Sequence, residues 1–354
     1  MLNKKFVLIA ALALLSAGCN PLVKSIPGGV IKSVNGGADW QFANTVSNPE
    51  KTSLSVLSFS KMGFDPNNRQ TLFAGSYTDG LFKSEDSGDT WKKILSKISV
   101  YDFAVNPQDP QIIYAAGIYA DHGRVLKTID GGASWNQVYN EESAANPVRV
   151  VVLNPDNPNQ IIIGTASGSA VKSADAGNTW QLIKDFTDRV NGLFWRSGNI
   201  YILLRNQGLL MAPGFGGSFS QITTSLNKTY DFSRLAYTTP NPISFFNQVY
   251  VDATTPDLIY MTTDKGLYKT TDGGKSWFLQ NLPIKPDQAD GRAIAISKSS
   301  SNIVYTSVGA TIYKSLDGGV NWQTEGVNIG GFINYILIDP ELPQIVYAGV
   351  YNTQ

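Results

Sequence analysis

Ser84-Glu85-Asp86-Ser87-Gly88-Asp89-Thr90-Trp91 is one copy of a short pattern, Ser/Thr-x-Asp-x-Gly-x-Ser/Thr-Trp, that recurs along this chain of 354 residues. The Asp side chain in such a stretch accepts backbone N–H bonds across a tight turn, and Gly supplies the positive φ that the turn needs. The hydroxyl residue ties the hairpin back, while Trp buries its ring beneath the turn. The pattern therefore predicts a β-hairpin rather than a catalytic group.

Seven copies of this pattern follow one another about 45 residues apart, a spacing typical of repeat architectures. The copy at 33–40 carries Asn35 in place of Asp, and the copy at 212–219 has lost its acid and ends in Phe219. Two sets of positions are predicted to be structural. They are the turn residues Asn35, Asp86, Asp130, Asp175, Asp272 and Asp317, and the closing residues Trp40, Trp91, Trp135, Trp180, Trp277 and Trp322.

The segments between the copies read as further strands. Short β-branched and aromatic runs at 112–117, 258–262 and 303–307 follow turn sequences such as Asn106-Pro107. Each unit reads as strand, Pro turn, strand, Gly turn, strand, hairpin and final strand. Four strands per unit, repeated radially, predict an all-β propeller built from four-stranded antiparallel blades.

The two ends of the chain complement each other. The last unit stops after two strands, at 348–351, and the first unit opens with the missing half, at 28–33. Joining them completes a seventh blade and removes two exposed sheet edges, whereas a linear solenoid would need capping repeats. We therefore expect residues 29–354 to form one seven-bladed propeller, closed by a blade that the N- and C-termini share.

The N-terminal segment has the anatomy of a secretory signal. Lys4 and Lys5 precede an apolar run at 6–15, and Leu15-Ser16-Ala17-Gly18-Cys19 follows. Small residues that end at a cysteine resemble the bacterial lipobox, so we expect a signal peptide at 1–18, a lipidated Cys19 and a linker at 19–28. An ordinary signal peptide or a membrane helix is the alternative, although the apolar run is short for a bilayer span. Acyl chains on Cys19 would attach the exported protein to the cell envelope, at the cell surface, facing the periplasm or on the outer membrane.

Composition excludes several classes of function. The 28 basic residues balance the 28 acidic ones, so no net charge attracts a polyanion, and nucleic acid is not an expected partner. One cysteine excludes an intramolecular disulfide and a thiolate metal cluster. His122 is the only histidine and falls in a predicted turn, so neither a metal site nor a Ser-His-Asp set is expected. No cofactor is predicted.

The repeated pattern resembles the Asp-box, also called the BNR repeat. The longer unit, with Tyr114-Ala115-Ala116-Gly117 in one strand and Leu81-Phe82-Lys83-Ser84 before the box, resembles sortilin-type receptor ectodomains, xyloglucanase-type glycoside hydrolases and photosystem II assembly factors. Sialidases share the box but not the longer unit. The resemblance covers the whole predicted propeller and implies its fold. It leaves function open, because one fold hosts many activities.

Candidate ligand-binding residues follow from alignment of the units on their Pro turns. One position of the innermost strand is polar in every unit: Ser60, Tyr101, Arg149, Asn191, Asn247, Arg292 and Asn334. From this ring and its surroundings we predict a ligand-binding channel face formed by Tyr101, Arg149, Arg189, Asn247, Arg292 and Asn334. The alternative is that these side chains solvate a water-filled pore.

No catalytic residue is predicted. Arg149, Arg189 and Arg292 resemble the arginines of sialidases, but acids within two residues of Arg189 and Arg292 suggest ordinary ion pairs. Glycoside hydrolysis needs two spaced carboxylates, and no motif marks any of the candidates Asp102, Glu141, Glu142, Asp185, Asp188 and Asp290. Xyloglucanase-type enzymes, moreover, place their acids between two propellers.

The longest irregular segment, at 220–246, combines aromatic residues and Arg234 in a manner that suits an interaction surface or a cover over the barrel. The predicted function is accordingly a surface-anchored, non-catalytic propeller that binds protein, peptide or glycan, or serves as an assembly scaffold. The alternative is a glycoside hydrolase of the xyloglucanase or sialidase type acting on extracellular polysaccharide.

Overall fold

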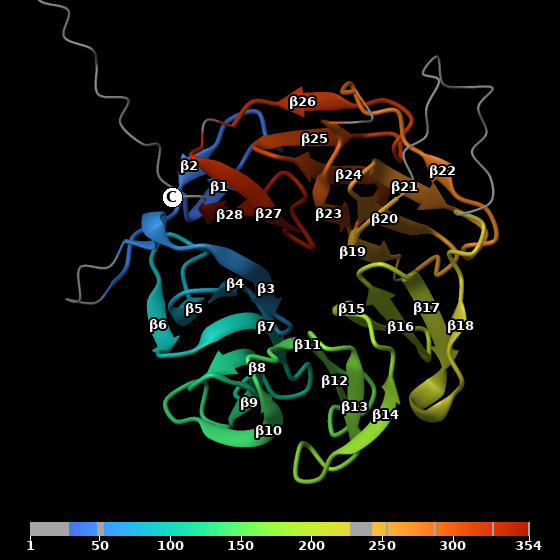
Figure 1. Cartoon of the computed structure of the whole chain (residues 1–354). Coiled ribbons are helices and arrows are strands. Elements are labelled where there is room, and N and C mark those ends of the chain that lie inside the picture. The colour runs from blue at the N-terminus through green and yellow to red at the C-terminus, as the bar shows by residue number, and fades with distance from the viewer. Residues whose placement is uncertain are drawn as a thin grey trace, which may run out of the picture.

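Seven four-stranded sheets surround a central axis in the computed structural model, which describes residues 28–47, 53–226, 243–252, 254–285, 288–327 and 329–352 (Figure 1). Neighbouring strands within each sheet run antiparallel, as in β1 (Val30–Ser33) and β2 (Gln41–Phe42). The predicted seven-bladed, all-β propeller is confirmed.

Some sequence-based expectations fall outside these residues. The signal peptide at 1–18, Cys19 and all but the last residue of the linker at 19–28 belong to this group. The central part of the irregular segment, 227–242, also belongs to it. Within the described ranges, no helix combines the length and the apolar character needed to cross a lipid bilayer.

The blades follow the chain around the ring, and in blades 1 to 6 the strands run in chain order from the axis to the rim. Blades 1 and 2 contain β3 (Phe59–Asp65), β4 (Asn68–Ser76), β5 (Gly80–Ser84), β6 (Lys92–Leu95), β7 (Ser99–Val105), β8 (Ile113–Tyr119), β9 (His122–Thr128) and β10 (Asn136–Ala144). Blades 3 and 4 contain β11 (Val148–Leu153), β12 (Ile161–Thr165), β13 (Ser169–Ser173), β14 (Gln181–Asp185), β15 (Val190–Arg196), β16 (Asn199–Leu204), β17 (Gly208–Pro213) and β18 (Ser220–Gln221). Blades 5 and 6 contain β19 (Phe246–Val251), β20 (Ile259–Thr263), β21 (Gly266–Thr270), β22 (Phe278–Leu279), β23 (Gly291–Ser297), β24 (Ser300–Val308), β25 (Thr311–Ser315) and β26 (Gln323–Glu325).

Blade 7 is shared between the two ends of the chain. Its strands run in the order β27 (Gly331–Ile338), β28 (Val346–Asn352), β1 and β2 from the axis outward. Four residue pairs join β28 to β1, and Val350 N donates a further hydrogen bond of 2.9 Å to the Gly29 carbonyl. Closure of the ring by both termini is therefore confirmed, and the pairing of β28 with β1 covers the edges that the two halves of blade 7 would otherwise expose.

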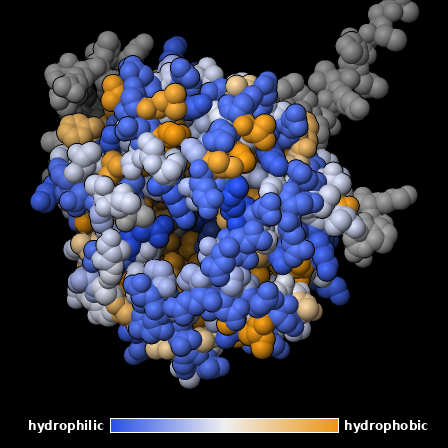
Figure 2. Space-filling model, turned by 180° about the vertical axis from the view of Figure 1, so that it is seen from behind, coloured by the Kyte–Doolittle hydropathy of each residue, from blue (hydrophilic) through white to orange (hydrophobic). Residues whose placement is uncertain are grey.

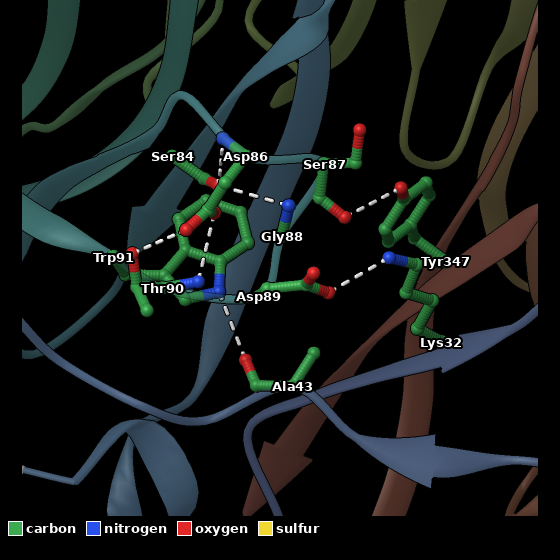
Figure 3. Close-up of polar contacts among 10 residues, drawn as sticks. All are labelled: Lys32, Ala43, Ser84, Asp86, Ser87, Gly88, Asp89, Thr90, Trp91 and Tyr347. Atoms are coloured by element: carbon green, nitrogen blue, oxygen red, sulfur yellow. Dashed lines mark hydrogen bonds and ion pairs between the residues drawn. The ribbon is translucent and has the colours of Figure 1, made fainter.

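Each Asp-box closes the hairpin between the third and fourth strands of a blade. In blade 1 the Thr90 backbone N–H donates to the Asp86 carboxylate (2.8 Å), and the Thr90 hydroxyl donates to its second oxygen (2.5 Å) (Figure 3). The Ser84 hydroxyl donates to the same carboxylate (2.8 Å) and accepts the Gly88 N–H (2.8 Å). Gly88 has a φ of +86°, which a residue with a Cβ rarely adopts. Asp86 thus satisfies donors that the tight turn would otherwise leave unpaired.

Apart from Trp40, whose Nε1 has no acceptor among the described residues, and Trp322, which donates to Gly319 of its own box, the closing tryptophans connect their boxes to the preceding blade. Their indole N–H groups donate to a carbonyl three residues beyond the preceding box's closing aromatic: Trp91 to Ala43 (2.9 Å), Trp135 to Ile94 (2.8 Å), Trp180 to Val138 (2.8 Å) and Trp277 to Ile222 (3.1 Å). A buried indole N–H needs an acceptor. The box therefore fixes the position of its blade against the one before it.

A Tyr and a Lys from the preceding blade complete this connection. The Tyr347 hydroxyl donates to the Ser87 carbonyl (2.8 Å), and Lys32 forms an ion pair with Asp89 (2.9 Å) (Figure 3). At three other boundaries, both donors reach one box carbonyl: Tyr114 and Lys127 at Ala176, Tyr260 and Lys269 at Gly318, and Tyr305 and Lys314 at Gly36. Each of these lysines also lies over the ring of its tyrosine, a favourable cation–π arrangement.

Replacing Asp317 by Ala is expected to lower the midpoint of thermal unfolding at pH 7 by a few degrees, because Asn321 and Ser315 lose their acceptor. Hydrogen bonds, first from the Asn321 backbone N–H, lower the pKa of Asp317 to about 2. The folded-state pKa lies below the unfolded one, so the stabilisation is complete above about pH 4 and disappears as the pH falls toward about 2. Scanning fluorimetry should therefore show a deficit that shrinks across this window.

Asp156, an exposed acid in the blade 3 turn, provides the matched control. Asp156→Ala should leave the midpoint unchanged at every pH. Equal deficits in the two variants would contradict a structural role for the box carboxylate.

Candidate ligand-binding face

Every innermost strand contains a β-bulge near its beginning. The pairing in β3 passes from Phe59–Ser76 to Lys61–Gly75 and leaves Ser60 unpaired, and the other six innermost strands slip at the corresponding place. The residues within these slips include Ser60, Tyr101, Arg149, Asn191, Asn247, Arg292 and Asn334, the ring that the aligned units single out. We call these seven residues the bulge ring. Bulges redirect side chains and are frequent beside functional sites.

Four members of the bulge ring hold neighbouring blades together. Each donates to the carbonyl of the residue just before the next blade's bulge: Ser60 to Val100 (2.7 Å), Asn191 to Phe246 (2.7 Å), Asn247 to Gly291 (2.7 Å) and Asn334 to Phe59 (3.1 Å). Asn247 and Asn334, which we predicted as ligand-binding residues, thus lie on the predicted ring with their amide nitrogens bound to backbone.

The other three members, Tyr101, Arg149 and Arg292, contact aromatic rings instead. The guanidinium carbon of Arg149 lies 4.6 Å from the centre of the Tyr101 ring. Tyr101 packs edge-on against Tyr77 (5.1 Å between centroids), and Tyr77 packs in the same manner against Tyr351 (5.8 Å). Blades 7, 1, 2 and 3 therefore contribute a continuous line of aromatic and guanidinium groups at this end of the propeller.

Three arginines from blades 3 and 4 gather beside this aromatic line. Burial, together with the neighbouring Arg149 and Arg205 guanidinium groups, lowers the pKa of Arg189 to about 10. Arg205, in the turn after β16, lies over the Phe245 ring at 4.0 Å. We call Arg149, Arg189 and Arg205 the arginine cluster.

The arginine cluster has no anionic partner among the described residues. The Nε atoms of Arg149 and Arg189 are buried and have no hydrogen-bond acceptor there, whereas Arg69 contacts two carboxylates, those of Asp339 and Glu341. Burying cationic groups together without an anion is unfavourable. The arrangement is therefore suited to an anion supplied from outside, such as a carboxylate, which guanidinium groups bind through paired hydrogen bonds.

The acids near these arginines behave in two different ways. Asp290 forms the expected ion pair with Arg292 (2.9 Å), and Arg292 also lies over the Phe332 ring. Asp188 does not form an ion pair with Arg189. Its carboxylate accepts the backbone N–H groups of residues 206 and 207 and the side-chain amide of Asn206, at 2.7–2.9 Å.

Side chains of different blades also bond to one another next to the bulge ring. Lys61 and Asp102 form an ion pair of 2.5 Å between blades 1 and 2. Although burial lowers it, the pKa of Lys61 is raised on balance by the Asp102 carboxylate, and burial raises the pKa of Tyr335 beside them. Gln248 reaches from blade 5 to the Asn334 carbonyl in blade 7 (3.0 Å). Next to the bulge ring, groups from different blades are thus joined in a polar network.

The space-filling view shows a hollow where the blades converge, with hydrophilic groups around its margin and apolar groups deeper inside (Figure 2). Among the described residues, no group of three or more His, Cys, Asp or Glu side chains is placed to hold a metal ion. His122 begins β9, directly after the turn, and its Nδ1 lies 3.1 Å from the Ala120 carbonyl oxygen. The chemistry of this face is thus that of guanidinium, aromatic and amide groups.

Sequence reasoning placed six residues at this face, five in the bulge ring and Arg189 in the arginine cluster, and missed others. Arg205, Tyr77 and Tyr351 come from the turns and strand ends of three different blades. No local pattern distinguishes them from other surface residues. The alignment of units could have indicated their position, because the turn between the second and third strands of each blade lies at the same end of the propeller as the bulge.

The described residues 79–207 match the family model for sortilin, neurotensin receptor 3 (Sortilin-Vps10). Among curated proteins, xyloglucanase Xgh74A of Acetivibrio thermocellus is 26% identical over 267 residues, which cover 60% of this chain and 31% of the enzyme. A xyloglucanase of Paenibacillus sp is 23% identical over 71% of this chain and 23% of the enzyme. The chain thus spans less than a third of the length of these relatives.

Solved structures share the fold at low identity. YCF48 bound to D1 peptide superposes with a TM-score of 0.61 and 17% identity, over 84% of this chain and 93% of that protein. The GH74 xyloglucanase from Xanthomonas campestris superposes with a TM-score of 0.65 and 14% identity, over 83% of this chain and 51% of the enzyme. At these identities, the two superpositions show a shared fold alone.

Some members of the bulge ring bond to the next blade and others contact aromatic rings instead. Substitutions in the two groups should therefore affect stability differently. Asn334→Ala removes an inter-blade hydrogen bond and should lower the unfolding midpoint by a few degrees. Arg149→Gln removes one of several adjacent, partly buried cations and should leave the midpoint unchanged or raise it, because their mutual repulsion is relieved. Thermal unfolding at low ionic strength measures both. A loss in Arg149→Gln as large as that in Asn334→Ala would show that Arg149 is a packing residue.

Proposed function

We propose that this chain, a propeller of the Asp-box repeat class, is a non-catalytic binding scaffold that captures a carboxylate-bearing segment of a protein or glycan at the bulge-ring end. The unpaired arginine cluster carries this proposal. A ligand carboxylate would supply the anion that Arg149 and Arg189 lack, and Tyr101 and Tyr77 would pack against its apolar groups. The peptide-bound state of one structural neighbour is consistent with a propeller of this shape acting as a receptor.

The contacts of the acidic residues support binding rather than catalysis. A retaining glycosidase needs two carboxylates about 5–5.5 Å apart, one of them free to act as a nucleophile. Asp102 is bound to Lys61 and to the Val151 N–H, and Asp188 is bound to backbone. Asp290 is paired with Arg292. The remaining candidates are on outer strands: Asp185 accepts the Thr187 N–H, Glu141 accepts the Tyr139 hydroxyl, and Glu142 is on β10.

Hydrolysis of polysaccharide is the second candidate function, because the curated relatives are xyloglucanases. It requires a groove with two free acids at the bulge-ring end. Release of reducing sugar from xyloglucan, abolished by Asp290→Asn, would favour it over the binding proposal.

The binding proposal also includes a lipid anchor at Cys19 that holds the protein on the cell envelope. The described chain begins at Gly28, whose carbonyl accepts the Asn44 amide, and Gly29 is bonded to Val350 on β28. The next residue of β28, Tyr351, belongs to the aromatic line, so the chain enters the propeller at the bulge-ring end. The nine residue steps from Cys19 to Gly28 span about 30 Å at most. The ligand-binding end would therefore lie close to the membrane surface.

A fluorescein-labelled peptide ending in Glu-Asp-Glu with a free carboxyl terminus tests the binding proposal by fluorescence anisotropy in low salt. We expect saturable binding that weakens as salt is added, because charge attraction is screened. Arg149→Gln combined with Arg189→Gln should weaken binding at least tenfold. Arg124→Gln, which changes an arginine bound to neutral side chains on blade 2, should have no effect.

A peptide with Gln and Asn in place of the acids and an amidated terminus is the neutral probe. Equal binding of the two peptides, or equal affinity of the double variant and the original protein, would overturn the proposal.

Replacing Cys19 by Ala tests the anchor. In a bacterial host, the original protein should incorporate a palmitate analogue and sediment with membranes, and Cys19→Ala should lose the label and become extractable without detergent. An unlabelled original protein, or a variant that stays in the membrane fraction, would refute lipid anchoring.

A further inference from the structure

The outermost strands of blades 1, 2 and 3 contain a second set of bulges. The pairing of β6, β10 and β14 with their neighbours skips Ile94, Val138 and Ile183, respectively. The carbonyls of Ile94 and Val138 accept the indole N–H groups of Trp135 and Trp180 from the next blade, each at 2.8 Å. A bulge at this place therefore presents a carbonyl to the closing aromatic of the following box.

Three boundaries lack this contact: Trp322 donates to Gly319 of its own box, Trp40 Nε1 has no acceptor among the described residues, and blade 4 has no closing indole. The closing aromatic of blade 4 is Phe219, which has no N–H group, so the Ile183 carbonyl of blade 3 receives no indole donor. Among the described residues, no side chain donates to this carbonyl. A backbone carbonyl is a strong acceptor, and Ile183, which is half-buried and lines a groove at this boundary, offers one to a donor from outside the chain.

The loss of the box also changes the shape of this boundary. The η2 turn (Gly214–Gly216) replaces the Asp-box hairpin, and Phe219 packs edge-on against Phe186 of blade 3 (5.5 Å between centroids). A groove of about 370 Å³ remains, lined by Lys172, residues 181–184 and residues 216–219. We call it the blade 3–4 groove.

The charge on the blade 3–4 groove is positive. Lys172 and Lys184 line it, and none of its lining residues is acidic. Like the lysines at other blade boundaries, Lys172 makes both a hydrogen bond and a cation–π contact. Its Nζ donates to the Phe215 carbonyl (3.3 Å) and lies over the Phe215 ring. Lys184 extends over the Phe186 ring with its ammonium group available to an anion. Leu182, 57% exposed, adds an apolar surface.

We propose that the blade 3–4 groove is a second binding site, which takes a Trp side chain next to an acidic residue from a partner protein. The indole N–H would donate to the Ile183 carbonyl, and the acidic neighbour would face Lys184. The chain itself demonstrates the first contact four times, since Trp91, Trp135, Trp180 and Trp277 bind the corresponding carbonyl of the preceding blade.

This site is separate from the arginine cluster. The box hairpins follow the third strand of each blade, whereas the bulge ring lies at the opposite end, where that strand begins. A partner in the blade 3–4 groove would therefore leave the proposed carboxylate site open, and the two proposals stand or fall independently.

Fluorescence anisotropy with two labelled peptides, acetyl-Gly-Asp-Trp-Gly and acetyl-Gly-Asp-Ala-Gly, tests the site on the full chain. The Trp peptide should bind saturably and at least tenfold more tightly than the Ala peptide. Phe219→Trp should supply the missing indole from within the chain, which should raise the unfolding midpoint and weaken Trp-peptide binding at least tenfold. Lys184→Gln should weaken binding several-fold, as expected for loss of a charge pair.

Leu316→Trp is the matched control, because Leu316 is an exposed box residue of blade 6 that lies away from the groove. It should leave peptide binding unchanged. Arg149→Gln with Arg189→Gln should also retain binding, which separates this site from the proposed function. No binding by the original protein, equal binding of the two peptides, or undiminished binding by Phe219→Trp would overturn the proposal.

Discussion

The connection between consecutive blades at the Asp-box is the constraint on which the rest of the structure depends. A box carboxylate such as Asp86 fixes a hairpin, and the Trp that follows hydrogen-bonds to the previous blade. Tyr and Lys side chains of that blade then bind a box carbonyl from the other side. Each blade is thus held by directional hydrogen bonds as well as by packing. Repeated around a ring whose ends share blade 7, these contacts fix the geometry of every innermost strand.

Because the boxes stabilise one end of the propeller, the opposite end is available for the proposed binding site. There the bulge ring combines two roles in one set of equivalent positions. The side chains of the first group, Asn191, Asn247 and Asn334, hydrogen-bond to the next blade. Arg149, in contrast, contributes a positive charge at this end of the propeller. Such a division allows a rigid frame to hold partly buried guanidinium groups without an anionic partner among the described residues, which a less constrained surface would release into solvent.

Periodicity explains how much of this could be predicted from the sequence. The box, the Pro turns and the complementary ends determine the fold because each is a local pattern that repeats. Alignment of those patterns also placed Tyr101 and Arg149 on a common ring. It could not show that Asn247 and Asn334 bind backbone, since the bulges that direct them have no sequence signature. The alignment also could not predict that Arg205 lies near Arg189, or that Asp188 bonds to backbone instead of pairing with Arg189. Both contacts depend on the conformation of the turn after β16.

The central claim is that Arg149 and Arg189 form an anion site held open by the frame. NMR of the guanidinium Nε–H groups during a citrate titration tests this most directly, with Arg69 and Arg124 as internal references. The account predicts saturable chemical-shift changes at Arg149 and Arg189 while the reference signals stay constant. Uniform small changes at all four arginines, or none at any of them, would contradict it.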